Sequence, residues 1–325
     1  MSLLLFKKVG ITIGLTEKCN LKCVHCLRQA SPNTGVDLPI YLLTKVLKEA
    51  RELEVQHVAL TGGEVGLHKD FDKAIDLIVK NGHTFSIVTN GNQPDYYTDI
   101  LNTYRNNILT FIAVSVDGAT SETYQYIRGG DFEAACNSLQ IFVQKGYRTK
   151  MAFCVNRINY KEFDDLIQLA INLHVPEVNV SGLIEFDFNS NLSLSPEEKN
   201  KIIEMCRFIN KNYKNIKVNM TTSLGAMDTI SPVVDFCNNI ASFNPFIRPN
   251  GDCDYCCDAE RTLLGSIKNT SLIELAKRHL EFSNYMRMDR YKRITEGNHE
   301  NISVCNYCIA TYKKFIAEKK YVESK

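Results

Sequence analysis

The sequence lacks a long hydrophobic segment, since no apolar run in its 325 residues approaches the roughly 18 residues needed to cross a membrane. It also carries almost no net charge: 38 Lys and Arg residues are balanced by 37 Asp and Glu residues, which gives a formal net charge of +1. Nothing therefore points to a nucleic-acid-binding surface or an acidic substrate. In residues 1–8 the lysines follow the apolar residues, the wrong order for a signal peptide. We expect a cytoplasmic protein without a membrane or nucleic-acid partner.

Cysteine, by contrast, is abundant, with 12 residues. In a cytoplasmic chain this number indicates metal ligands or redox groups rather than disulfides. Most of them form three groups: Cys19, Cys23 and Cys26; Cys237, Cys253, Cys256 and Cys257; Cys305 and Cys308. The others, Cys136, Cys154 and Cys206, stand alone in apolar surroundings, where a thiol behaves as a small hydrophobe.

The first group has the spacing C-x3-C-x2-C and lacks a fourth ligand nearby. It follows an apolar stretch, residues 9–15, that reads as a strand, and the next cysteine, Cys136, is more than 100 residues away. A closed structural zinc site needs four ligands. Three thiolates can instead hold one face of an iron–sulfur cube and leave one iron open to another chelator. The alternatives are a chance cluster of cysteines and a zinc loop whose fourth ligand lies elsewhere in the chain.

Strand-like and helix-like segments alternate between residue 10 and about residue 183. Strands are predicted at 10–15, 57–61, 84–89, 110–116, 149–155 and 177–182, and helices at 39–54, 69–81, 95–106, 120–145 (with a break at Gly129-Gly130) and 160–173. This alternation indicates βαβ units and a parallel sheet. Six units are too few for a closed eight-fold barrel and suit an α/β fold with a partial (β/α)6 TIM-like barrel. In such folds ligands bind at the C-terminal ends of the strands.

The first cysteine group resembles the signature of the radical S-adenosylmethionine (SAM) enzymes, C-x3-C-x-aromatic-C, with His25 in the aromatic position. The resemblance implies that Cys19, Cys23 and Cys26 ligate a [4Fe–4S] cluster whose open iron chelates SAM. In that family an electron from the cluster cleaves SAM to a 5′-deoxyadenosyl radical, which abstracts a substrate hydrogen. An electron donor of the flavodoxin or ferredoxin type is implied as well.

Two motifs after the second and third predicted strands agree with this resemblance. Gly62, Gly63 and Glu64 are similar to the family's GGE motif, whose backbone meets the SAM amino group. Asn90 lies in a stretch similar to the TNG motif that lines the SAM pocket, although a plain Asn-Gly turn is an equal alternative.

Two further candidates follow the fourth and sixth predicted strands. Ser115 and Arg128 resemble an S-x-D-G … R-G pattern whose serine and arginine hold the SAM carboxylate. The planar fork of arginine suits a carboxylate, although Arg128 could also be a surface helix cap. Leu183 marks the position where the adenine would pack.

The C-terminal part of the chain is predicted to form a second domain. Ser195, Pro196 and Glu198 predict a helix start with a capping box, and that helix runs to about Tyr213. We place the boundary near residue 230, so that residues 1–230 form the barrel and residues 231–325 a small cysteine-rich domain. In the latter, Asn250-Gly251 predicts a hairpin, and a helix is expected from about Ser271 to Phe282.

The second domain supplies a complete set of four thiolates, Cys237, Cys256, Cys305 and Cys308. Such a set can hold zinc or a [4Fe–4S] cluster. The arrangement resembles the SPASM or twitch extensions of radical SAM enzymes, which implies one auxiliary [4Fe–4S] cluster. The full SPASM form has seven cysteines, so the shorter twitch form fits better.

Cys257 directly follows Cys256, and neighbouring side chains on a strand point to opposite faces. If Cys256 faces the auxiliary cluster, Cys257 would face the substrate and could donate a hydrogen atom from sulfur to a carbon radical. In peptide epimerases of the resembled family a cysteine does this. A spare ligand and a packed thiol are the alternatives, and the role of Cys253 stays open.

The resemblance favours modification of a ribosomally synthesised peptide, by epimerisation or by cross-link or thioether formation. Only about 10 residues precede the first predicted strand, whereas peptide-modifying relatives often carry a leader-binding domain there. Oxidation of a small-molecule alcohol in natural-product biosynthesis is therefore an alternative. The second alternative is a zinc-stabilised binding protein without enzymatic activity. Metal analysis that finds zinc but no iron or sulfide would indicate this alternative.

Overall fold

The computed structural model describes residues 8–30, 35–104, 108–225, 237–259, 261–297 and 303–323. Its centre is a parallel sheet whose first seven strands lie side by side in chain order. They are β1 (Lys8–Gly14), β2 (His57–Thr61), β3 (Thr84–Thr89), β4 (Leu109–Ser115), β5 (Thr149–Val155), β6 (Glu177–Gly182) and β7 (Lys217–Met220). The expected partial parallel α/β barrel is confirmed, and β7 extends it beyond the six expected units by pairing in parallel with β6.

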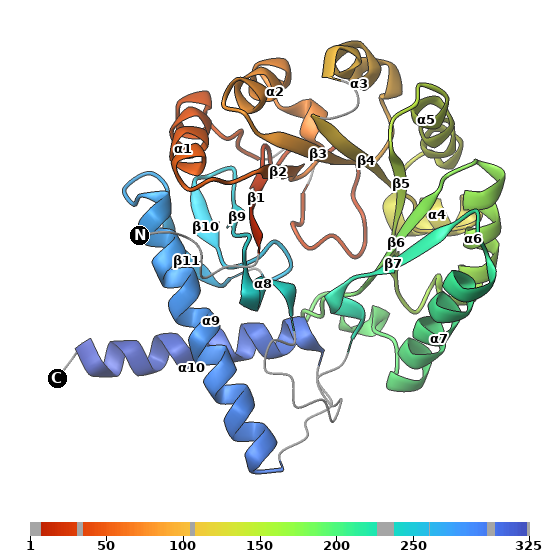
Figure 1. Cartoon of the computed structure of the whole chain (residues 1–325). Coiled ribbons are helices and arrows are strands. Elements are labelled where there is room, and N and C mark those ends of the chain that lie inside the picture. The colour runs from red at the N-terminus through yellow and green to blue at the C-terminus, as the bar shows by residue number, and fades with distance from the viewer. Residues whose placement is uncertain are drawn as a thin grey trace.

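Helices cover the outside of the curved sheet (Figure 1). They are α1 (Ile40–Glu52), α2 (Phe71–Lys80), α3 (Pro94–Leu101), α5 (Phe132–Gln144), α6 (Phe163–Asn172) and α7 (Pro196–Asn212). A further helix, α4 (Ser121–Arg128), precedes α5 in the chain. On α1 the buried residues Leu42, Leu43, Val46, Leu47 and Ala50 recur at helical spacing and form one apolar face. Each fully buried leucine or valine contributes about 1.5–3 kcal/mol. Among the described residues, no helix has the length and apolar character needed to cross a membrane.

The predicted break in the helical segment 120–145 is confirmed, and local chemistry explains it. Gly129 ends α4 in the left-handed conformation, with φ of 68°. Asp131 then caps α5, because its side chain accepts a hydrogen bond from the Ala134 amide. The break fixes Arg128 as the last residue of α4, at the mouth of the barrel.

The capping box predicted at the start of α7 is also confirmed. The Glu198 amide donates to Ser195 Oγ at 3.2 Å, and the Ser195 amide donates to Glu198 Oε2 at 2.7 Å. Pro196 occupies the first turn, where its missing N–H costs nothing.

The C-terminal part of the chain continues the same sheet beyond β1. After α8 (Asn238–Ala241) come β8 (Ser242–Phe243), β9 (Phe246–Ile247), β10 (Asp252–Asp254) and β11 (Leu263–Ser266). Both β8 and β9 pair in parallel with β1, and β10 lies antiparallel between β9 and β11. The predicted hairpin at Asn250-Gly251 is confirmed, with Gly251 at φ of 90°. The predicted domain boundary near residue 230 lies outside the described residues.

Two long helices, α9 (Leu272–Thr295) and α10 (Val304–Glu323), complete the chain and cross each other outside the barrel (Figure 1). The helix expected to end near Phe282 therefore continues to Thr295. Cys305 and Cys308 lie in the first turns of α10.

Candidate functional site

Cys19, Cys23 and Cys26 lie on the long connection between β1 and α1, at the C-terminal ends of the parallel strands. The loop is fastened to the end of α4: the Val24 amide donates to the Ile127 carbonyl at 2.9 Å, and the Cys23 thiol donates to the Arg128 carbonyl at 3.7 Å. The Leu21 amide donates to Cys19 Sγ at 3.5 Å. The first strand and the fourth helix thus jointly position the three thiols.

These three thiols are not gathered around one point. Tetrahedral zinc with Zn–S bonds near 2.3 Å would hold its thiolates roughly 3.8 Å apart. Among the described residues, the only set of three metal-ligating atoms within 4.8 Å of one another belongs to Cys256, Cys257 and Asp258. A cluster does not require that closeness, because each thiolate binds a different iron.

Burial and the charge of Arg128 act in opposite directions on the thiols of the cysteine loop. Burial raises the pKa of the Cys23 thiol to about 11, and the positive charge of Arg128 opposes that rise. Burial raises the pKa of Cys19 as well, and the hydrogen bond from the Leu21 amide and the positive charge of Arg128 oppose that rise. The residues present therefore fit a [4Fe–4S] cluster whose irons would replace the thiol protons.

The glycine turn after β2 packs directly against this loop. The Gly63 amide donates to the Thr16 carbonyl at 2.7 Å, and the Glu64 amide donates to the Lys18 carbonyl at 2.8 Å. A Cβ on Gly63 would lie 2.1 Å from the Lys18 carbonyl oxygen. Glycine is therefore required here for close approach to the cysteine loop. The contact of Gly62 and Gly63 with the SAM amino group stays a prediction.

The side chains of Glu64 and Asn90, both predicted cofactor contacts, shape the same loop. The buried Glu64 carboxylate accepts hydrogen bonds from Thr89 Oγ1 at 2.6 Å, the Asn90 amide at 2.7 Å and the Tyr97 hydroxyl. Burial raises the pKa of Glu64, and these hydrogen bonds oppose the rise. Asn90 Nδ2 donates to Asn20 Oδ1, next to Cys19, at 2.7 Å. Sequence reasoning missed this supporting network.

Arg128 lies inside the barrel mouth, with 12% of its side chain exposed, so the surface-cap alternative is wrong. Its Nη1 atom is 2.5 Å from Asp117 Oδ2, a partner that sequence reasoning missed. Ser115 is half-buried at the end of β4, and Leu183 is buried just after β6. All three predicted SAM contacts thus lie at the same end of the strands.

The structure brings the second cysteine set together from distant parts of the chain. Cys237 precedes α8, Cys256 follows β10, and Cys305 and Cys308 begin α10. Burial raises the pKa of Cys305, and the nearby charges of Asp258, Cys308 and Cys237 raise it further. The charge of Cys237 acts on Cys256 and on Cys308 as well. Cys237 thus acts on each of the other three thiols, as expected for ligands of one metal cluster, and the assignment stays a prediction.

The expectation that Cys256 and Cys257 face opposite sides of a strand is wrong. Strand β10 ends at Asp254, after an irregularity in its pairing between Cys253 and Asp254, and both cysteines lie in the following bend. Their thiols converge: a hydrogen bond with Cys257, together with burial, raises the pKa of Cys256 well above its usual value. The Cys257 thiol also donates to Asp258 Oδ1 at 3.6 Å.

Cys253, whose role the sequence left open, is fully buried in β10. Burial raises the pKa of its thiol. It belongs to the hydrophobic core, which agrees with a packed thiol.

Arg28 connects the two cysteine regions and was not found from the sequence. Its Nη2 atom donates to the Cys257 carbonyl at 2.8 Å, and its guanidinium carbon lies 3.8 Å from the centre of the Phe246 ring. Since Arg28 is two residues past Cys26, the bend with Cys257 lies directly beside the first cysteine loop.

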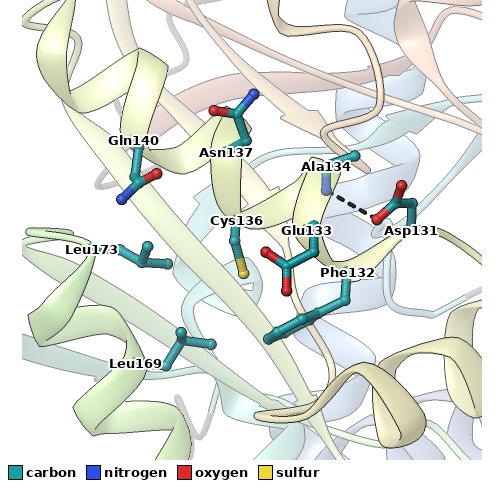
Figure 2. A pocket seen from close by; sticks show the side chains of 9 residues that line it. All are labelled: Asp131, Phe132, Glu133, Ala134, Cys136, Asn137, Gln140, Leu169 and Leu173. Atoms are coloured by element: carbon teal, nitrogen blue, oxygen red, sulfur yellow. Dashed lines mark hydrogen bonds between the residues drawn. The ribbon is translucent and has the colours of Figure 1, made fainter.

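A separate hollow of about 600 Å³ lies between α5 and α6, in the outer layer of helices (Figure 2). Phe132, Leu169 and Leu173 form its apolar side, and Glu133 and Gln140 are polar members of its lining. It contains none of the predicted site residues, and its cysteine, Cys136, has a pKa raised to about 12 by burial. Its lining matches none of the chemistry predicted for the site.

A partial parallel barrel with an open set of three thiols at its mouth is typical of one class of iron–sulfur enzymes. The model of the Radical SAM superfamily matches residues 13–170. This part of the chain, which contains the cysteine loop and most of the barrel, belongs to the radical SAM superfamily.

Characterised relatives share part of this chain. It is 24% identical over 211 residues to the antilisterial bacteriocin subtilosin biosynthesis protein AlbA of Bacillus subtilis, covering 63% of this chain and 47% of AlbA. It is 29% identical over 166 residues to the mycofactocin maturase MftC of Mycobacterium tuberculosis, covering 50% of this chain and 41% of MftC. The chain thus spans about half the length of the curated relatives it matches.

Solved structures show the same fold. SuiB of Streptococcus suis bound to S-adenosylmethionine aligns with a TM-score of 0.69 at 15% identity, over 83% of this chain and 65% of SuiB. The enzyme anSMEcpe with bound AdoMet aligns with a TM-score of 0.66 at 17% identity, over 95% of this chain and 96% of that one. The second match extends through the C-terminal cysteine-rich region, which resembles SPASM and twitch structures.

Proposed function

We propose that this radical SAM enzyme modifies a ribosomally synthesised peptide and that epimerisation is its reaction. The observation that carries the proposal is the contact between Arg28 and the Cys257 carbonyl, because it places a half-buried thiol beside the cysteine loop. Names of relatives support a peptide substrate: AlbA serves bacteriocin biosynthesis, MftC is a maturase, and SuiB has been solved with its precursor peptide SuiA.

In this proposal Cys19, Cys23 and Cys26 hold the SAM-binding [4Fe–4S] cluster. When bound, cluster and SAM together supply a 5′-deoxyadenosyl radical able to abstract a substrate hydrogen. Gly62, Gly63, Asn90, Ser115, Arg128 and Leu183 surround SAM, while Glu64 acts through its backbone. Cys237, Cys256, Cys305 and Cys308 hold one auxiliary [4Fe–4S] cluster. We place the protein in the cytoplasm, where thiols stay reduced.

Cys257 would complete the reaction from the opposite side of the substrate. Its S–H bond breaks as a new C–H bond forms on the carbon radical, which inverts the centre. One electron, from a donor of the flavodoxin or ferredoxin type, and one proton from solvent then restore the thiol. The adjoining Cys256 offers a short route for that electron through the auxiliary site.

The test combines the anaerobically reconstituted enzyme, a reductant, SAM and peptides encoded beside its gene, in deuterated water. We expect 5′-deoxyadenosine and a peptide with one inverted residue that carries deuterium, because the Cys257 thiol exchanges with solvent. Cys257→Ala should keep SAM cleavage but lose the inverted product, whereas Cys253→Ala, which changes a core thiol outside the bend, should keep both.

Unchanged product from Cys257→Ala would remove the donor role. A cross-linked or thioether product would keep the peptide substrate and replace epimerisation. Inactivity on every peptide, with oxidation of a small-molecule alcohol instead, would replace the proposed substrate class.

A further inference from the structure

One buried carboxylate, that of Asp117, joins three parts of the barrel mouth. Its Oδ2 atom lies 2.5 Å from Arg128 Nη1 and 3.1 Å from His25 Nε2. Its Oδ1 atom accepts a hydrogen bond from the Cys154 amide on β5 at 2.7 Å. The side chain is 1% exposed. Asp117 therefore links the cysteine loop, the end of α4 and a barrel strand.

The charges around Asp117 make this link strong. Burial opposes its ionisation, but the positive charge of Arg128, together with the contact with His25 and the hydrogen bond from the Cys154 amide, outweighs burial and lowers the pKa of Asp117. Asn159 Nδ2 also donates to the Asp117 backbone carbonyl at 3.0 Å. These partners hold the Asp117 carboxylate in one position, and the carboxylate in turn orients the side chains of Arg128 and His25.

Both partners keep a buried nitrogen unused. Among the described residues, Arg128 Nε and His25 Nδ1 have no hydrogen-bond partner. An arginine has five N–H donors in a fixed fork, so one held through Nη1 can still donate to a ligand. Leaving such a donor unpaired in a buried site is costly unless a ligand accepts from it.

We propose that Asp117 is a positioning residue that orients Arg128 toward the carboxylate of SAM and holds His25, and with it the cysteine loop, in register. The inference rests on the proposed function, because it takes SAM to be the ligand at this mouth. Asp117 acts through its neighbours, as the partners of metal-ligating residues do, and the loss of such partners typically reduces metal affinity or activity about 10–100-fold. We expect an effect of the same order on SAM binding.

The test measures SAM affinity, iron content, melting temperature and the electron paramagnetic resonance (EPR) spectrum of the reduced holoenzyme, with and without SAM. Asp117→Asn should bind SAM about 10–100-fold more weakly and alter the EPR spectrum of the SAM complex. Asp117→Glu keeps the charge and displaces the carboxylate by one methylene. If Asp117→Asn fails to fold, weaker SAM binding by Asp117→Glu is sufficient to support the proposal.

Glu162→Gln is the matched control. Glu162 accepts hydrogen bonds from the Ala119 amide at 2.9 Å and from Thr123 Oγ1, so it anchors the other end of α4. The Glu162→Gln variant should therefore bind SAM as tightly as the unmodified enzyme does. Tight SAM binding by Asp117→Glu or Asp117→Asn would overturn the positioning role, whereas failure of the unmodified enzyme to bind SAM would instead overturn the proposed function.

Discussion

Replacing Cys23 with alanine is expected to abolish SAM cleavage. Cys23 is the middle thiol of the loop and is fastened to the end of α4 through the Arg128 carbonyl. Its loss leaves two protein ligands for the catalytic cluster, so the variant should lose about four irons per chain. Formation of 5′-deoxyadenosine should fall at least about a thousandfold, as for other indispensable catalytic groups.

Cys206→Ala supplies the control for this experiment. Cys206 is fully buried on α7 among apolar residues, so its replacement should leave iron content and SAM cleavage unchanged. The auxiliary site should keep its iron in both variants. A Cys23→Ala protein that still cleaves SAM at the normal rate would contradict the assignment of the first cysteine loop.

Replacing Gly63 with alanine should have the second-largest effect, although no predicted metal ligand changes. The new Cβ would meet the Lys18 carbonyl oxygen at 2.1 Å and its carbonyl carbon at 2.6 Å. These are backbone atoms next to Cys19, so relief requires movement of the cysteine loop. Overpacking of this kind costs about 1–3 kcal/mol, and a displacement near 1 Å at a reacting centre can reduce the rate about 100-fold. Melting temperature and 5′-deoxyadenosine formation measure the two effects.

Gly10→Ala, on β1 itself, is the matched control. A Cβ at Gly10 would lie 3.5 Å from its nearest neighbours, the Asn244 side chain and the His57 carbonyl. This is ordinary contact, so activity should stay normal. Equal activity of Gly63→Ala and Gly10→Ala would contradict the idea that the glycine turn fixes the cysteine loop.

Features set by neighbouring residues could be predicted from the sequence. The alternation of strands and helices, the break at Gly129, the capping box of Ser195 and the Asn250-Gly251 hairpin all arise from local chemistry and all are confirmed. The end of α9 was misplaced because residues 283–295 contain neither glycine nor proline to stop the helix. Gly297 comes just after its actual end.

Features set by distant residues could not be predicted. The Arg28 hydrogen bond to Cys257 joins residues 229 apart in sequence, and the Arg128 carbonyl contact with Cys23 joins residues 105 apart. Pairing of β9 with β1 follows from packing of the whole chain, which no local pattern encodes. The misreading of Cys257 has a similar cause, since an irregularity in β10 ended the alternation on which the prediction relied.

The central claim is that the first cysteine loop holds a cluster with an iron open to SAM, and one measurement tests it most directly. Anaerobically reconstituted, unmodified protein is analysed for iron, sulfide and zinc, then reduced, and its EPR spectrum is recorded with and without SAM. Two clusters predict about eight irons per chain, with a SAM-dependent change in one of two signals. Zinc without iron or sulfide, or a spectrum that SAM leaves unchanged, would contradict the account.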